Sequence, residues 1–302
     1  MAQRPTPVPS EKLSLWRRIA LHVWGEPTSP TICATRDYDV ENAIRFLDWY
    51  NSAHETHVTM TALLIKAAAL SIQKYPELNR RIVAGRLYDL PTIDIAAPVN
   101  LGGQGETAMI LIRDADKKTL DEIATDLKGR VRATKETSSK LENQNEIGKI
   151  IDAVPPFILG AVVRVAKFAV TNFNIAELVP NMDMSPGSFS VSSLGMNEAA
   201  TFTGLALMPP AGMGVVGSMI VGRVEPKPVA ENGKVVIRHR LPLMAFFDHR
   251  AVDGWKITRY GQFWQDFLKN PGAFLDIEWD MNGPSRSKGP KTAKPRRGMK
   301  NK

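Results

Sequence analysis

The chain has 302 residues, of which 43% are apolar and 23% are charged. This composition is typical of a globular protein with a sizeable core, and it excludes a chain that is disordered along most of its length. The length fits one large α/β domain or two smaller domains, and no linker-like segment divides it. We therefore predict a single folded domain over residues 1–283, with an N-terminal helical arm.

The formal charge of +8 belongs to the C-terminal end of the chain. Residues 284–302 contain eight Lys and Arg side chains and no acidic one, so the rest of the chain is formally neutral. A segment rich in Pro, Gly, Ser and Lys cannot order itself by burial, and we expect 284–302 to be a basic disordered tail. Such tails are more often solubilising than specific, so no specific nucleic-acid binding is predicted.

Cys33 is the single cysteine of the chain, which therefore has no internal disulfide. We predict that it is a small hydrophobic residue of the core; a nucleophilic role is the alternative. Residues 1–10 lack the apolar stretch of a secretory signal, and no run of about 20 apolar residues could span a membrane. These features predict a cytoplasmic protein.

Periodicity predicts mixed helices and strands in the first half of the chain. Asp39 can cap the second helix, and Thr59 opens the clearest one, which ends ahead of Pro76. The predicted helices cover 12–23, 40–53, 59–75 and 120–141, and the predicted strands cover 81–87, 92–99 and 106–113.

An unusually apolar helix is predicted between residues 147 and 173, centred on 154–171. The favoured interpretation is a core or oligomer-contact helix. Two alternatives stay open. One is a helix that lies on a membrane surface with Arg164 and Lys167 at the headgroups. This membrane contact is less favoured than a core or oligomer contact. The other is a lining for a long acyl chain.

The second half is predicted to be mostly β. Asn232-Gly233 between two runs is a strong hairpin signal. A final helix over Gly254–Leu268 should face inward with its aromatic residues. The predicted strands are 187–193, 201–207, 214–224, 234–240 and 243–248.

The segment Asp248-His249-Arg250-Ala251-Val252-Asp253-Gly254 follows the last strand and precedes the last helix. An imidazole titrates near neutral pH and can take and return a proton, so His249 is the predicted general base. Asp253 either orients the ring or fixes an arginine that shapes the site. Asp248 and Arg250 are predicted to support the turn, and Gly254 to permit close approach of the backbone.

A second candidate feature is the hydroxyl-rich run from Gly187 to Gly195. The pattern alone favours a strand with serines on its solvent face. The functional alternative is a hydroxyl that stabilises a developing oxyanion. Spacing does not place such a hydroxyl beside His249.

Two other motifs are predicted to carry no function. Gly212 to Gly217 matches G-x-G-x-x-G, but it follows two prolines and leads into a strand, whereas a dinucleotide site needs a preceding strand and a following helix. His54 and His57 have no further ligand nearby, so we predict surface histidines and no metal site.

In sequence order, several of these segments resemble the catalytic domain of the acyltransferase component of 2-oxo acid dehydrogenase complexes. The seven-residue segment 248–254, called the heptad below, is shared with chloramphenicol acetyltransferases and is the most specific part of the resemblance. The resemblance spans roughly residues 36–275. Its other segments are Pro76-Glu77-Leu78-Asn79, Ile112-Arg113-Asp114-Ala115-Asp116, Phe189-Ser190-Val191-Ser192-Ser193-Leu194-Gly195 and Pro209-Pro210.

The resemblance implies a chloramphenicol-acetyltransferase-like fold, a mixed β-sheet with flanking helices, assembled as a homotrimer with active sites between subunits. It implies an acyltransferase that uses coenzyme A thioesters. His249 would be the base, Ser192 the oxyanion donor, and Asp253 the holder of an arginine. Trp16-Arg17-Arg18 is similar to the segment that supplies this arginine in chloramphenicol acetyltransferases, which makes Arg18 the predicted partner.

The chain also departs from the family. It starts almost at the catalytic domain, so we expect it to carry no covalent lipoyl group, and a lipoyl-bearing protein or dehydrogenase components would act in trans. Residues 105–111 replace the usual Gly-Leu-x-x-Pro-Val, and 142–186 is longer and more apolar than usual. In other members the C-terminal segment joins trimers into larger cores. The basic tail replaces that segment here, so no large shell is expected. A non-catalytic oligomeric scaffold is the alternative function.

Overall fold

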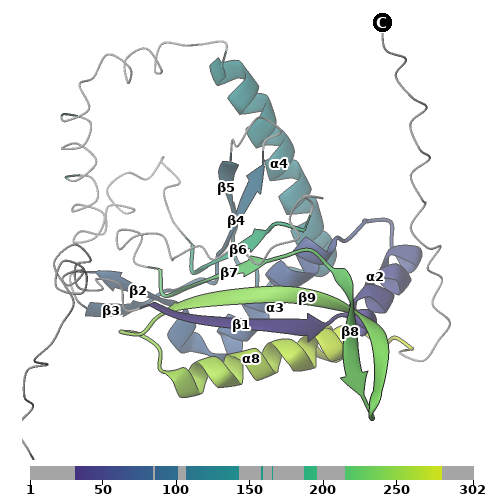
Figure 1. The fold of residues 1–302 in the computed structure, drawn as a ribbon. Coiled ribbons are helices and arrows are strands. Elements are labelled where there is room, and N and C mark those ends of the chain that lie inside the picture. Colours follow the sequence, from purple (N-terminus) through teal and green to yellow (C-terminus); the bar gives the residue numbers. More distant parts are fainter. Residues whose placement is uncertain are drawn as a thin grey trace, which may run out of the picture. The chain divides into compact units, whose positions relative to one another are not determined.

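The computed structural model describes residues 31–83, 86–100, 107–142, 158, 165, 187–195 and 215–280. Their main element is a seven-stranded mixed sheet in the order β1-β9-β7-β6-β4-β5, with β8 paired to β9 (Figure 1). The pairs β4–β6 and β6–β7 are parallel and the others are antiparallel. The strands are β1 Thr31–Asp39, β4 Ile95–Asn100, β5 Thr107–Ile112, β6 Phe189–Ser193, β7 Gly217–Val221, β8 Glu225–Glu231 and β9 Lys234–Asp248.

Helices flank this sheet, which confirms the predicted fold class. They are α2 Glu41–Ala53, α3 Met60–Lys74, α4 Leu120–Glu142, α8 Gly254–Lys269, α9 Pro271–Leu275 and the 3-10 turn η1 Pro76–Leu78. A separate hairpin joins β2 Arg80–Val83 to β3 Arg86–Asp89.

The helix boundaries follow local chemistry. Thr59 caps α3 because its hydroxyl accepts the amide of Ala62, and α3 ends before Pro76, as predicted. Asp39 accepts the amide of Glu41 at 3.0 Å, so it satisfies a free donor at the start of α2.

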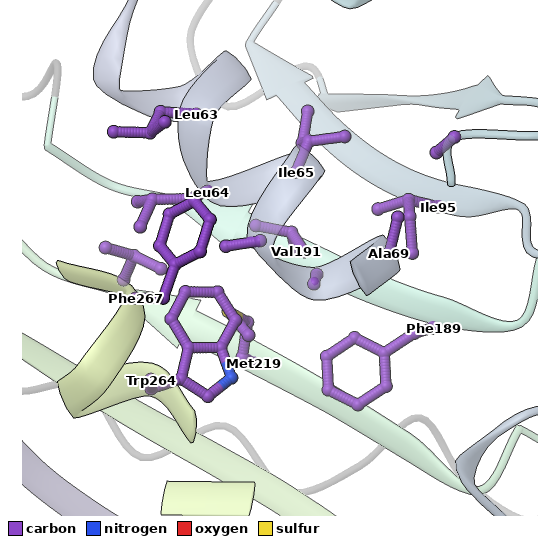
Figure 2. Close-up of a cluster of buried hydrophobic side chains, with 14 of the residues drawn as sticks. Leu63, Leu64, Ile65, Ala69, Ile95, Phe189, Val191, Met219, Trp264 and Phe267 are labelled. Carbon is purple, nitrogen blue, oxygen red and sulfur yellow. The ribbon is translucent and has the colours of Figure 1, made fainter. Parts of the chain in front are cut away.

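The core lies between one face of the sheet and helices α3 and α8 (Figure 2). Phe189 and Val191 on β6 and Met219 on β7 supply the sheet side, and all three are fully buried. Trp264 and Phe267 of α8 pack into the same cluster, as the inward face of this helix predicted.

Two strand predictions were wrong. The run 81–87 is not one strand, because Val83 pairs with Arg86 and the chain must reverse between them. The runs 234–240 and 243–248 form one 15-residue strand, β9.

Pro242 does not interrupt β9 because the neighbouring strand changes at this point. β7 ends at Val221, which pairs with Leu243, and β8 begins at Glu225, which pairs with Arg240. The missing amide of Pro242 therefore leaves no ladder bond unmade on that side. The proline carbonyl still accepts the amide of Gly222 at 2.9 Å.

The predicted turn at Asn232-Gly233 is confirmed, since both residues have positive φ angles of 50° and 75°. Its first strand, however, is β8, which sequence analysis missed because Pro226 and Pro228 disfavour a strand. The β8–β9 ribbon has an exposed apolar face on which Pro228 lies opposite Ile237 and Ala230 opposite Val235.

The prediction for Cys33 was also wrong, because its side chain is exposed. β1 is an edge strand on which successive side chains alternate between faces, and Tyr38 is buried while Cys33 points to the other face. The thiol nevertheless loses part of its hydration to neighbouring atoms, which raises the pKa of Cys33.

Several predictions fall outside the described residues. They are the helix at 12–23, the strand at 201–207 and the tail 284–302. The apolar helix of 147–173 also lies outside them, except for Ile158 and Val165, which are helical and exposed. Within the part of the chain that can be described, no helix is both long and apolar enough to cross a membrane.

Candidate active site

The turn at Asp248–Asp253 is fixed by its first residue. The amide of Asp248 donates to the carbonyl of Val216 at 2.9 Å, and its own carbonyl accepts the amides of Ala251 and Val252. The carboxylate of Asp248 accepts Nε of Arg250 at 3.0 Å and its Nη2 at 2.6 Å, a two-pronged contact. This hydrogen bonding raises the pKa of Arg250. Asp248 and Arg250 are thus joined within the turn, and their support of a catalytic site stays a prediction.

We expect Asp248→Asn to lower the free energy of unfolding by about 1–3 kcal/mol, because a mostly buried charged acceptor loses one of its two equivalent oxygens. Urea unfolding followed by circular dichroism measures the change. Asp266→Asn on the exposed side of α8 is the matched control and should change stability little. Equal losses in the two variants would contradict this role of Asp248.

His249 stands on this turn with 53% of its side chain exposed. Its Nδ1 lies 3.9 Å from Oδ1 of Asp253, which is longer than a hydrogen bond but close enough for a carboxylate to favour one ring orientation. With Nδ1 directed at Asp253, Nε2 is the nitrogen left for a substrate. Arg18, the predicted partner of Asp253, lies outside the described residues.

Gly254 is the first residue of α8. A Cβ atom placed on it would meet no atom within 4 Å. The prediction that this glycine permits close approach of another backbone is therefore wrong within one chain.

The hydroxyl-rich strand divides its serines between two faces. Ser188, just before β6, is buried; its hydroxyl donates to the carbonyl of Thr92 and accepts the amide of Asp94, which ties β6 to the start of β4. Ser193 accepts a hydrogen bond from Thr61 on α3 at 3.1 Å, so it faces the helices. By alternation, Ser190 and Ser192 lie on the opposite face, and both are partly exposed.

Sheet register places Ser192 and His249 at opposite ends of the sheet. Ser192 is level with Ile220 on β7, which is level with Met244 on β9, four residues before Asp248. Four residues along a strand and two strand spacings correspond to about 16 Å between the backbones of Ser192 and Asp248. At this separation the two side chains do not contact each other within one copy of the chain.

Two further motifs of the sequence are the G-x-G-x-x-G match and the pair His54 and His57. Gly217 of the G-x-G-x-x-G match is the first residue of β7, so a strand follows where a dinucleotide site requires a helix. The ring of His54 stacks on Tyr50 with 3.8 Å between centroids. Among the residues whose positions are described, no three His, Cys, Asp or Glu side chains gather as metal ligands.

Sequence analysis missed Arg81, a partly buried cation of β2 whose backbone pairs with Val215, near this turn. No pattern in the sequence distinguishes Arg81 from Arg80. Only the fold does so, because Arg80 pairs with Asp89 while Nε of Arg81 has no partner among the described residues.

Two solved structures have a similar fold. The dihydrolipoamide acetyltransferase of Azotobacter vinelandii matches with a TM-score of 0.59 and 19% identity, covering 91% of this chain and all of the other. In that protein a serine, a histidine and an asparagine were investigated for roles in the catalytic mechanism. The cubic core of a pyruvate dehydrogenase multienzyme complex matches with a TM-score of 0.57 and 20% identity, over 91% of this chain and all of that chain.

Sequence comparison leads to the same class. Residues 16–149 and 174–275 match the family of 2-oxoacid dehydrogenases acyltransferase (catalytic domain). The chain therefore belongs to this family.

Individual relatives are distant. A dihydrolipoyllysine-residue acetyltransferase component of the Cupriavidus necator pyruvate dehydrogenase complex is 25% identical over 70% of this chain and 30% of its own length. The corresponding component of the Bacillus subtilis acetoin cleaving system is 22% identical over 73% of this chain and 44% of its own length. The chain thus spans less than half the length of these two relatives.

Proposed function

We propose that this chain is an acyltransferase that moves an acyl group between coenzyme A and a thiol, hydroxyl or amine acceptor. The observation that carries the proposal is the heptad turn, in which Asp248 and Arg250 hold an accessible His249 beside Asp253. Membership of the acyltransferase family supports it independently.

His249 would act as the general base. Nε2 accepts the proton of the acceptor's thiol, hydroxyl or amine as that atom attacks the thioester carbonyl. The carbonyl oxygen becomes an oxyanion in the tetrahedral intermediate. When the intermediate collapses, the carbon–sulfur bond breaks, and the imidazolium returns the proton to the departing thiolate of coenzyme A.

Ser192 would donate its hydroxyl hydrogen bond to that oxyanion. Because Ser192 and His249 lie at opposite ends of one sheet, the donor would come from a neighbouring copy of the chain. Each site would then lie between subunits, as a closed homotrimer allows. The exposed apolar face of the β8–β9 ribbon, with Val235 75% and Ile237 63% exposed, is suited to contact with another protein surface.

The relatives' names direct the choice of acceptor. They describe transfer to a dihydrolipoyllysine residue, so a dihydrolipoyl arm carried by another protein is the first acceptor to test, together with dehydrogenase components as partners. Small hydroxyl and amine acceptors follow.

The test is transfer from acyl-coenzyme A of several chain lengths to dihydrolipoamide, with wild type and Ser192→Ala. We expect the variant to lose about 10²–10³-fold in kcat, the usual effect of removing an oxyanion donor. Ser190→Ala, on the same face and strand, is the matched control and should keep its turnover. No detectable transfer by the wild type to any acceptor would favour the scaffold function instead.

A further inference from the structure

Arg81 is a partly buried cation for which the described residues provide no charged partner. Its Nε has no hydrogen-bond acceptor although it is shielded from solvent. Burial lowers the pKa of Arg81, and no neighbouring carboxylate opposes that change. A guanidinium stays charged in proteins, so the described residues leave its partial loss of hydration uncompensated.

The lack of an ion-pair partner is particular to Arg81, because the neighbouring arginine of the same strand has one. Arg80, one residue earlier on β2, donates from Nε to Asp89 at 2.7 Å across the hairpin. The cross-strand neighbour of Arg81 is Tyr88, which offers no charge. The same two-stranded hairpin thus pairs one arginine and leaves the other unpaired.

Arg81 also lies beside the catalytic turn. Its backbone forms an antiparallel bridge with Val215. The next residue, Val216, accepts the amide of Asp248, which precedes His249. A second contact joins the same regions, since Lys256 on the first turn of α8 forms a 3.0 Å ion pair with Glu77 of η1. Two strand spacings of about 5 Å each separate β2 from the turn, a distance that one arginine side chain and a small acyl group can span.

We propose that Arg81 binds an oxyanion of the substrate, which is either a carboxylate on the acyl group beside His249 or a phosphate at the far end of the pantetheine arm of coenzyme A. An unpaired guanidinium offers two parallel donors that match either group, and pairing removes the cost of a buried lone charge. Arg81 is thereby a specificity-determining residue of the proposed acyl transfer, on which this inference rests. A carboxylate would belong to a dicarboxylic acyl group, and a phosphate would belong to coenzyme A.

The experiment measures binding rather than turnover, so its outcome does not depend on the catalytic proposal. Calorimetric titrations in a His249→Ala background use four probes: coenzyme A, acetyl-coenzyme A, succinyl-coenzyme A and pantetheine, which has no phosphate. They are repeated with Arg81→Met and with the matched control Arg80→Met.

We expect Arg81→Met to weaken at least one anionic probe about tenfold or more and Arg80→Met to change none by more than about twofold. Weakening of succinyl-coenzyme A alone identifies the carboxylate. Equal weakening of the three coenzyme A compounds, with pantetheine unchanged, identifies the phosphate.

Unchanged binding of all four probes, or an equal loss for the uncharged pantetheine, would overturn the proposal. Should Arg81→Met fail to fold, Arg81→Lys keeps the charge and removes the two-pronged geometry. It must then weaken the same anionic probe at least about threefold, and binding equal to that of the parent protein would overturn the assignment.

Discussion

Replacing His249 by alanine should reduce acyl transfer by about 10²–10⁴-fold while leaving the protein folded and assembled. In the proposed mechanism the imidazole takes the acceptor's proton, and 53% of the side chain is exposed, so its removal leaves no cavity in the core. Steady-state turnover measures the first effect, and sedimentation velocity measures assembly. A variant with wild-type turnover would exclude His249 as the base.

The placement of Ser192 far from His249 in one chain allows a stronger form of this test. His249→Ala and Ser192→Ala are each expected to lose at least about 10²-fold in turnover, but a site that takes His249 from one subunit and Ser192 from its neighbour is intact in some mixed oligomers. Equal amounts of the two variants, unfolded and refolded together, should recover about a quarter of the wild-type activity by random assembly. Refolding each variant alone is the control. No recovery in verified mixed oligomers would show that the two groups do not share a site.

The largest effect on stability is expected for Trp264→Ala. Trp264 is fully buried between α8 and the sheet, and its removal leaves a cavity that a packed core fills only in part. We expect the free energy of unfolding to fall by about 3–5 kcal/mol, measured by urea denaturation.

Trp255 provides a matched control on the same helix. Its side chain is 68% exposed, with Arg259 stacked 4.9 Å from the ring centroid. Trp255→Ala should change stability by no more than about 1 kcal/mol. A loss as large as that of Trp264→Ala would mean that the described packing of α8 is wrong.

The sequence was most informative where a local signal and burial agree. The threonine cap and following proline defined α3, and the spacing of Ile257, Tyr260, Phe263 and Trp264 defined the buried face of α8. The prediction for His249 rests on the heptad, whose unusual residues lie together in sequence. The contact between Asp248 and Arg250 is local, because the two residues are only two positions apart in the sequence.

Features that depend on distant pairing were not predictable in this way. β8 contains two prolines that disfavour a strand, yet it pairs with β9 along its full length. The separation of Ser192 from His249 follows from a register across three strands, which no local pattern encodes. Arg80 and Arg81 are adjacent and chemically identical, and only the fold distinguishes the paired cation from the unpaired one.

β9 has a further consequence for how this protein can change during evolution. One uninterrupted strand runs from the tip of the β8–β9 ribbon to the turn that carries His249, and it is paired with β1, β7 and β8 on the way. Inserting or deleting a single residue anywhere along it would invert the facing of every side chain on one side of the change. A change of length at the Asn232-Gly233 turn, beyond the paired residues, would leave the register from the base of the ribbon to the imidazole unchanged.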